Sequence, residues 1–119
     1  MTDERNPTGV ELEEVPPEEW AGWCEKATSE HNGREVLLRQ ADQALGEVRL
    51  AEGQRLVAFE FDEFGNTTAL TIKCGSPAVP VSYVVAQPQS IGEHRDGDGV
   101  TDVVSILDST GRRTSVSLA

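Results

Sequence analysis

The sequence predicts an α+β domain that is mainly β: one N-terminal amphipathic helix packed on a curled antiparallel sheet or small barrel of six to eight short strands. Two observations predict this fold class. Between residues 45 and 118, apolar and polar residues alternate in runs separated by Gly, Asn, Asp and Pro. A period of two places successive side chains on opposite faces of a strand. Over residues 20–31, apolar residues instead recur at the period of a helix.

The chain of 119 residues has the length of a single domain. Residues 1–15 are polar and acidic, with few large apolar side chains. Such a segment buries too little surface to offset its ordering entropy, so we expect a disordered tail there. The folded domain is expected to span residues 16–119.

The helix is expected at about residues 17–31. Proline suits a first helical turn, and the two acidic residues of the segment Pro-Pro-Glu-Glu at 16–19 favour the positive end of the helix dipole. The apolar stripe that follows consists of Trp20, Trp23, Cys24, Ala27 and His31. Trp23 lies nearer the middle of this stripe and is expected to be the more deeply packed tryptophan. Asn32-Gly33 is a typical C-terminal stop.

The remaining segments are predicted as strands. We place them at residues 34–40, 45–50, 55–62, 67–74, 81–86, a short piece around Ile91, 100–107 and 113–118. The segments at 62–66, 96–99 and 108–111 contain the Gly and Asx residues of tight hairpins. Pro80 and Pro88 bracket the fifth strand, and because proline lacks a ladder donor, this strand is expected at or near a sheet edge.

The charge of the chain excludes several classes of partner. Twenty-one acidic residues against ten basic ones give a formal net charge of -11. Nucleic acids and anionic membranes bind through Lys and Arg, so neither is an expected partner. The acidic surface, the core of small residues and the two lysines among ten basic residues are also typical of halophilic adaptation.

Several short motifs stand in an order that resembles a family of small bacterial single-domain proteins of unknown function. In that family a Pro-x-x-x-Trp helix is followed by His-x-Gly and then by strands that end in Asp-Gly-x-x-Thr. The matching positions here are Pro16 to Trp20, His31 and Gly33, Leu56, Phe59, Asp62, Pro88, Ile106, and Asp108-x-x-Gly111-x-x-Thr114. Arg34 departs from the pattern, which has an aromatic residue there. The resemblance implies the helix-plus-β architecture and makes Trp20, His31, Gly33 and Pro88 signature or interaction positions; it implies no activity.

No residue pattern predicts an enzyme, and we expect no catalytic residue and no cofactor. Cys24 and Cys74 are expected to be buried thiols, with a disulfide between them as the alternative. His31 ends the helix stripe, where a histidine interacts favourably with the dipole and the last carbonyls. The sequence contains no Gly-x-Ser-x-Gly, phosphate loop or His-Glu-x-x-His.

The acidic loop after His94 resembles a calcium loop in its spacing. Asp96, Asp98 and Asp102 fall at ligand positions of such a loop. The first and twelfth positions would be His94 and Ser105, where Ca²⁺ prefers carboxylates. A hairpin turn with solvated acids is therefore expected, and weak divalent-metal binding is the alternative.

These observations favour a non-catalytic protein-interaction or accessory module. Its partner would be an unknown protein or a second copy, paired through an edge strand. The alternative function is a small-ligand or weak Ca²⁺-binding domain. No apolar window reaches the length of a membrane span, and residues 1–15 lack the pattern of a secretory signal, so the expected compartment is the cytoplasm.

Overall fold

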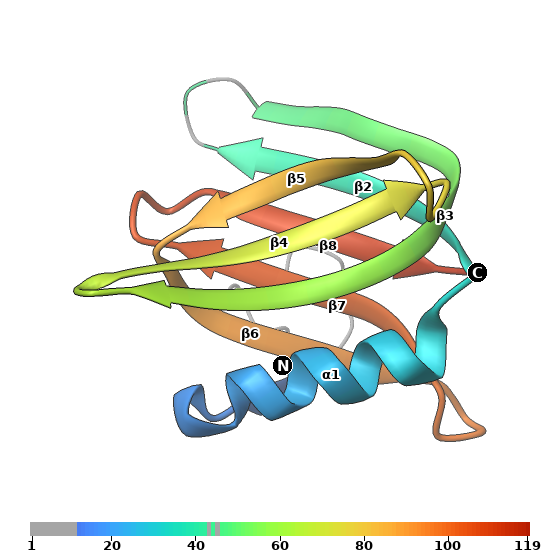
Figure 1. The fold of residues 1–119 in the computed structure, drawn as a ribbon, viewed down its shortest axis with the longest axis horizontal. Helices are drawn as coiled ribbons and strands as arrows, with labels where there is room; N and C mark the ends of the chain where they lie inside the picture. The colour runs from blue at the N-terminus through green and yellow to red at the C-terminus, as the bar shows by residue number, and fades with distance from the viewer. Residues whose placement is uncertain (1–11, 43, 45) are drawn as a thin grey trace, which may run out of the picture.

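In the described part of the chain, the alternating runs form one antiparallel sheet with one α-helix beside it (Figure 1). The computed structural model describes residues 12–42, 44 and 46–119. In chain order its elements are β1 (Glu13–Val15), the 3₁₀ turn η1 (Pro17–Glu19), α1 (Trp20–His31), β2 (Glu35–Asp42), β3 (Gly46–Phe64), β4 (Thr67–Gly75), β5 (Pro80–Ala86), β6 (Pro88–Arg95), β7 (Thr101–Asp108) and β8 (Arg113–Leu118). The predicted fold class is confirmed.

The sheet is strongly folded but does not close into the barrel that was one of the two expected forms. Its strand order is β1-β6-β7-β8-β2-β3-β4-β5, so β1 and β5 are the edges. The end of the sheet that carries β4 and β5 lies over β6 and β7, and the two parts contact one another (Figure 1). The position of β5 confirms the edge that its flanking prolines predicted.

Strand β3 corrects the expectation of two separate strands at 45–50 and 55–62. Gly53 has φ +73°, and the register with β2 skips one residue there, because Val36 faces Gln54 whereas Leu37 faces Glu52. A glycine with positive φ forms a β-bulge, which bends a strand without ending it. One continuous strand therefore pairs with β2 through its first half and with β4 through its second half. Leu45 lies outside the described residues.

Helix α1 covers the edge of β3 that β2 leaves open beyond the bend. The Thr28 hydroxyl donates to the carbonyl of Phe59 at 3.1 Å and accepts from its N–H at 2.9 Å. After the helix, Gly33 N–H donates to Leu56 O at 2.8 Å, and Leu56 N–H donates to Arg34 O at 2.8 Å. Gly33 has φ +90°, the left-handed conformation predicted for the helix stop. The helix end thus acts in place of a neighbouring strand.

The apolar stripe of α1 packs on this half of β3, but the two tryptophans exchange their expected roles. Trp20 is 6% exposed and meets Phe61 edge to face, with ring centroids 5.7 Å apart. Its indole N–H donates to Val15 O at 2.9 Å. Trp23 is only partly buried against Phe59. The expectation that Trp23 packs more deeply is wrong, because β1 covers the first turn of the helix.

Strand β1 also shortens the predicted tail. Residues 13–15 were expected to belong to it, but they pair with β6, with Val15 opposite Ile91. Val15 is buried and anchors this short strand. An acidic composition does not prevent pairing where a sheet edge satisfies the backbone groups and one apolar side chain reaches the core. Residues 1–11 of the expected tail lie outside the described residues.

Candidate functional site

A buried carboxylate of β6 connects this strand to α1. Glu93 is 8% exposed and shares the inward face of β6 with Ile91. Trp23 Nε1–H donates to its Oε2 at 3.0 Å, and the Thr101 hydroxyl donates to the same oxygen at 3.3 Å. Arg95 Nη2 donates to Oε1 at 3.0 Å. Both oxygens of Glu93 therefore have partners, as a buried charge requires.

The surroundings of Glu93 keep this carboxylate ionised. Burial by itself raises its pKa, but the hydrogen bonds from Trp23, Arg95 and Thr101 and the positive charge of Arg95 outweigh burial. The pKa of Glu93 consequently lies below its usual value. A carboxyl group with a lowered pKa is a poor general acid or base near neutral pH, whereas it is well suited to hold Trp23 in one orientation.

His31 and Arg34 connect the end of α1 to the first residue of β7 and to the last residues of the chain. His31 is 4% exposed, and its Nδ1 lies 3.0 Å from Arg34 Nη1. Arg34 also donates to the carbonyls of Thr101, Leu118 and Ala119. Because arginine can only donate, His31 Nδ1 accepts and its proton is on Nε2. Burial, followed by the charge of Arg34, lowers the pKa of His31, so this histidine is neutral at pH 7.

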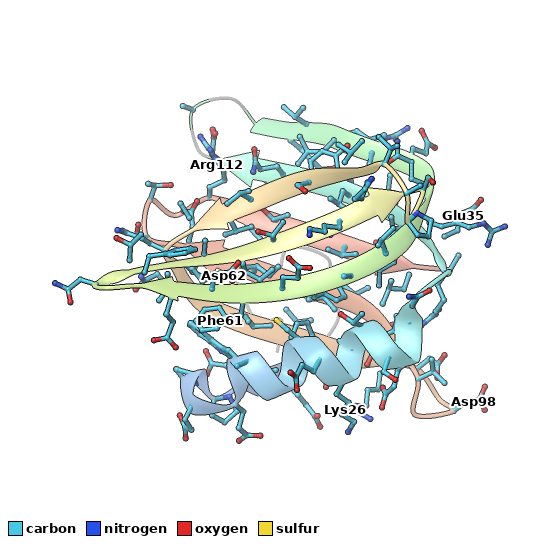
Figure 2. The ribbon with its side chains drawn as sticks, in the orientation of Figure 1. Lys26, Glu35, Phe61, Asp62, Asp98 and Arg112 are labelled. Atoms are coloured by element: carbon cyan, nitrogen blue, oxygen red, sulfur yellow. The ribbon has the colours of Figure 1, made fainter. Side chains whose placement is uncertain are left out.

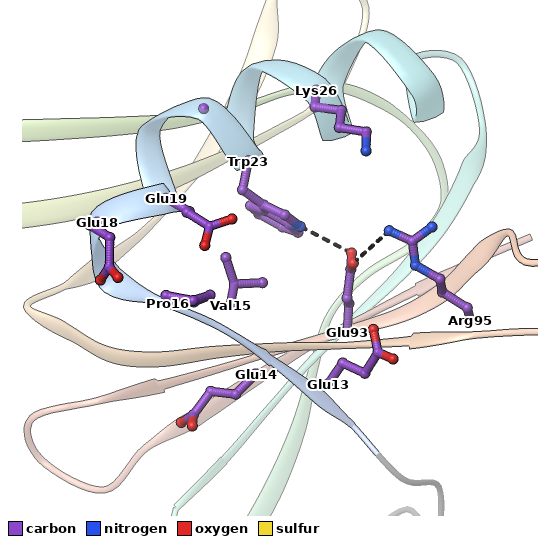
Figure 3. A pocket seen from close by; sticks show the side chains of 11 residues that line it. Glu13, Glu14, Val15, Pro16, Glu18, Glu19, Trp23, Lys26, Glu93 and Arg95 are labelled. Atoms are coloured by element: carbon purple, nitrogen blue, oxygen red, sulfur yellow. Dashed lines mark hydrogen bonds and ion pairs between the residues drawn. The ribbon is translucent and has the colours of Figure 1, made fainter.

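A pocket of about 410 Å³ opens beside the Glu93 cluster, which consists of Glu93, Trp23, Arg95 and Thr101 (Figure 3). The paired strands β1 and β6 line one side, and η1 and α1, which follow one another in the chain, line the other. The residues that line it are Glu13, Glu14, Val15, Pro16, Glu18, Glu19, Gly22, Trp23, Lys26, Glu93 and Arg95. A second hollow of about 500 Å³ lies along Glu14–Glu18, Trp20, Gln89 and Ser90. Five carboxylates and two cationic groups face the first pocket around one indole ring.

Strand β5 presents the second unusual surface. Val81 and Val84 of this strand are 47% and 60% exposed, and Val79, just before the strand, is 78% exposed. Val81, Tyr83 and Val85 face the buried residues of β4, and the Tyr83 hydroxyl donates to Leu50 O at 3.3 Å. Beyond β5 the sheet order contains no further strand in the described part of the chain. Natural sheets protect such edges with charged residues or proline, and here Pro80 and Pro88 flank the strand but no charged residue lies between them.

The acidic loop is a hairpin turn stabilised by its own carboxylate. Asp96 Oδ1 accepts from the backbone N–H of Asp98 at 2.8 Å and of Val100 at 3.1 Å. Asp102 Oδ1 instead lies 2.6 Å from His94 Nδ1. Asp98 points into solvent at the tip of the loop (Figure 2). The three carboxylates do not converge, and no group of three His, Cys, Asp or Glu that could hold a metal occurs among the described residues.

The two cysteines carry no activated thiolate. Both are free and buried, which matches the first of the two alternatives and leaves the disulfide unformed. Burial, with a smaller effect of the Asp62 charge, raises the pKa of Cys24 to about 12. Burial raises the pKa of Cys74 to about 11. Nucleophilic chemistry needs a lowered thiol pKa, and both values are shifted the other way.

The four signature positions do not form one site. Trp20 is in the core, Gly33 makes the turn after α1, and Pro88 is buried where β6 begins. His31 alone lies near the Glu93 cluster, whose charge acts on it. The sequence reasoning missed Glu93, Arg95 and Thr101. The period of two places Glu93 on the same face of the strand as Ile91. This shared face was the signal in the sequence that Glu93 could be buried.

Comparison with protein families, with curated proteins and with solved structures finds no match to this chain. The resemblance to the bacterial family therefore stays a prediction. In the described part of the chain, no helix has the length and apolar character needed to cross a bilayer. Two surfaces are candidates for binding: the edge of β5 and the 410 Å³ pocket beside Trp23, which we call the Trp23 pocket.

Proposed function

We propose that this protein is a non-catalytic interaction module that takes an extended segment of a basic partner protein as an added strand beside β5. The exposed, apolar edge of β5 is the observation that carries the proposal. Strand addition to a free edge is a common mode of peptide recognition, in which backbone hydrogen bonds supply affinity and alternate side chains supply specificity.

The register of β5 identifies the backbone groups that would bind the partner. Gln87 N–H donates to Thr68 O at 2.8 Å, and the pairing with β4 then runs without a bulge from Ala86 to Pro80. In an antiparallel ladder, bonded pairs recur every second residue. Tyr83 and Val85 therefore bond to β4, whereas the N–H and C=O groups of Ser82, Val84 and Ala86 point away from it.

Charge favours a basic partner over a second copy. Two copies of a chain with a net charge of -11 repel one another as they approach. A segment rich in Lys or Arg is attracted by the same field and adds opposite charge as it binds. We therefore commit to a basic segment, and self-pairing of β5 is an outcome that the experiment can detect.

We further propose that the module acts in the cytoplasm, and two observations support this location and the non-catalytic role. Cys24 and Cys74 are inert buried thiols that stay unpaired, as in a reducing compartment. His31 is neutral, with its Nδ1 bonded to Arg34. Among the described residues, these groups offer no nucleophile activated by a neighbouring base.

The test is amide hydrogen exchange on the whole protein with a short peptide of alternating Lys and Val. We expect new protection at Ser82, Val84 and Ala86, with Tyr83 and Val85 unchanged because β4 already protects them. A peptide with Glu in place of Lys should bind at least about tenfold more weakly. Protection elsewhere, or equal binding of the acidic peptide, would refute the proposal.

Matched valine substitutions locate the interaction. Val84→Lys places a like charge against the basic peptide and should weaken binding at least about tenfold. Val100→Lys makes the same change at an exposed valine of another segment and should leave affinity within about twofold. Concentration-dependent protection of the same amides without peptide would identify a second copy as the occupant and overturn our choice of partner.

A further inference from the structure

The Trp23 pocket has features of a binding site that are independent of β5. Its volume of about 410 Å³ lies in the range of small-molecule sites. It is built from β1, η1, α1 and β6, whereas β5 lies at the other end of the strand order. The Trp23 pocket is therefore a second candidate site, separate from the β5 edge.

The indole of Trp23 is fixed before any ligand arrives. Its N–H donates to Glu93, which Arg95 and Thr101 hold in turn, and its ring packs against Phe59 with centroids 5.3 Å apart. Trp23 remains only partly buried, because the pocket lies beside it (Figure 3). A fixed aromatic ring loses little entropy on binding, and the face of Trp is the best aromatic surface for a cation.

The charges around the ring favour a cation as the occupant. Arg95 forms an ion pair with Glu93, and Lys26 Nζ lies 3.9 Å from Glu30 Oε1. Each cationic group of the pocket therefore already has a carboxylate partner. Glu18 and Glu19 have no ion-pair partner among the residues that the structure describes. Glu19 directs its carboxylate toward the side of the pocket where Trp23 lies (Figure 3). The excess negative potential is therefore next to the indole.

We infer that this pocket binds an organic cation, a guanidinium or alkylammonium group stacked on Trp23 and neutralised by Glu19. The same chemistry has two sources, an arginine or lysine side chain of a protein and a free quaternary ammonium compound. The polar rim of carboxylates supplies charge, and Val15 and Pro16 supply apolar contact for the carbon atoms of such a ligand.

The test follows the indole N–H resonances of the two tryptophans by nuclear magnetic resonance, assigned with Trp23→Phe. Addition of N-acetyl-arginine amide or tetramethylammonium should shift the Trp23 signal saturably, with a dissociation constant on the order of 1 mM. The Trp20 signal, which belongs to a core ring, should stay in place. The neutral isostere N-acetyl-citrulline amide should bind at least about fivefold more weakly.

Two substitutions separate a site from a general charge effect. Glu19→Gln should weaken binding about threefold. Glu25→Gln removes an equal charge from an exposed residue of α1 that does not line the pocket and should change affinity by less than about 1.5-fold.

A pentapeptide with one arginine between glycines distinguishes the two sources. Tighter binding of this peptide than of tetramethylammonium assigns the pocket to a protein side chain, and the reverse assigns it to a free quaternary cation. Either order supports an organic-cation site. Equal binding of the citrulline amide, equal effects of Glu19→Gln and Glu25→Gln, or no saturable shift would overturn it, and none of these results bears on the β5 edge.

Discussion

The two hydrogen bonds between the Thr28 hydroxyl and the open edge of β3 lead to a quantitative prediction about stability. One hydroxyl of α1 satisfies both backbone groups of Phe59, which have no neighbouring strand on that side. Thr28→Val keeps the shape and nearly the helix propensity of the side chain but removes both hydrogen bonds. The substitution therefore isolates the role of the helix as a substitute strand.

The magnitude follows from the two groups left without a partner. An unsatisfied buried donor or acceptor costs about 1–3 kcal/mol. The bonds here are only partly buried, so we take about 1 kcal/mol for each and expect a loss of about 2 kcal/mol in the free energy of unfolding. For a domain of this length that corresponds to a fall of roughly 8 °C in Tm.

Urea and thermal unfolding, followed by circular dichroism, measure this loss. Thr28→Ser keeps the hydroxyl and loses one methyl group, so it should cost at most about 1 kcal/mol. Ser29→Ala alters the exposed neighbour on the same helix and should stay within about 0.5 kcal/mol of the parent. If Thr28→Val proves as stable as Thr28→Ser, the helix does not substitute for a strand in the way described.

The remaining predictions concern salt, pH and calcium. Stability should rise with NaCl, most steeply below about 0.15 M, because the Debye length falls from about 30 Å at 0.01 M to about 8 Å at 0.15 M and screens the acidic surface; a Tm that stays flat from 10 mM to 1 M would remove the main support for halophilic adaptation. The pKa of His31 is lowered in the folded protein, so protonation favours unfolding, and stability should decline as the pH falls below about 6.5. His31→Gln should abolish this decline when the free energy of unfolding is measured by urea titration at a series of pH values. An unchanged decline in the variant would assign the titration to another group. Millimolar Ca²⁺ should leave Tm unchanged, since the carboxylates of the 96–102 loop do not converge; a rise that Asp96→Asn removes would restore the calcium alternative.

The sequence predicted local structure well because local structure follows from short-range patterns. The helix at 17–31 corresponds to η1 and α1, and the stop at Asn32-Gly33 has the expected positive φ at the glycine. Strand β1 was not predicted, and strand β6 was predicted only as a short piece around Ile91. Glu93 occupies an inward position there, so the apolar alternation that indicates a buried face is interrupted.

The candidate sites were much less accessible to sequence reasoning. The period of two and the flanking prolines were sufficient to place β5 at an edge. The Trp23 pocket was not foreseen, because it joins a helix residue to Glu93, 70 positions further along the chain. Arg34 donates to the carbonyls of Thr101, Leu118 and Ala119, which are distant in the chain, so its role was not visible in the sequence.

The sequence by itself determined the class of the domain, most of its strand boundaries, its single helix and its acidic character. The first three depend on residues within a few positions of one another, through side-chain period and turn chemistry, and the acidic character is a sum over the composition. Only the tertiary structure decided that β3 bends without ending, that α1 satisfies its open edge, and that β1 buries Trp20. It also decided that Glu93 stays ionised in the interior, since that requires Trp23, Arg95 and Thr101 to converge on one carboxylate. Partners so distant in the chain meet only when the whole sheet has folded, and no local pattern contains that information.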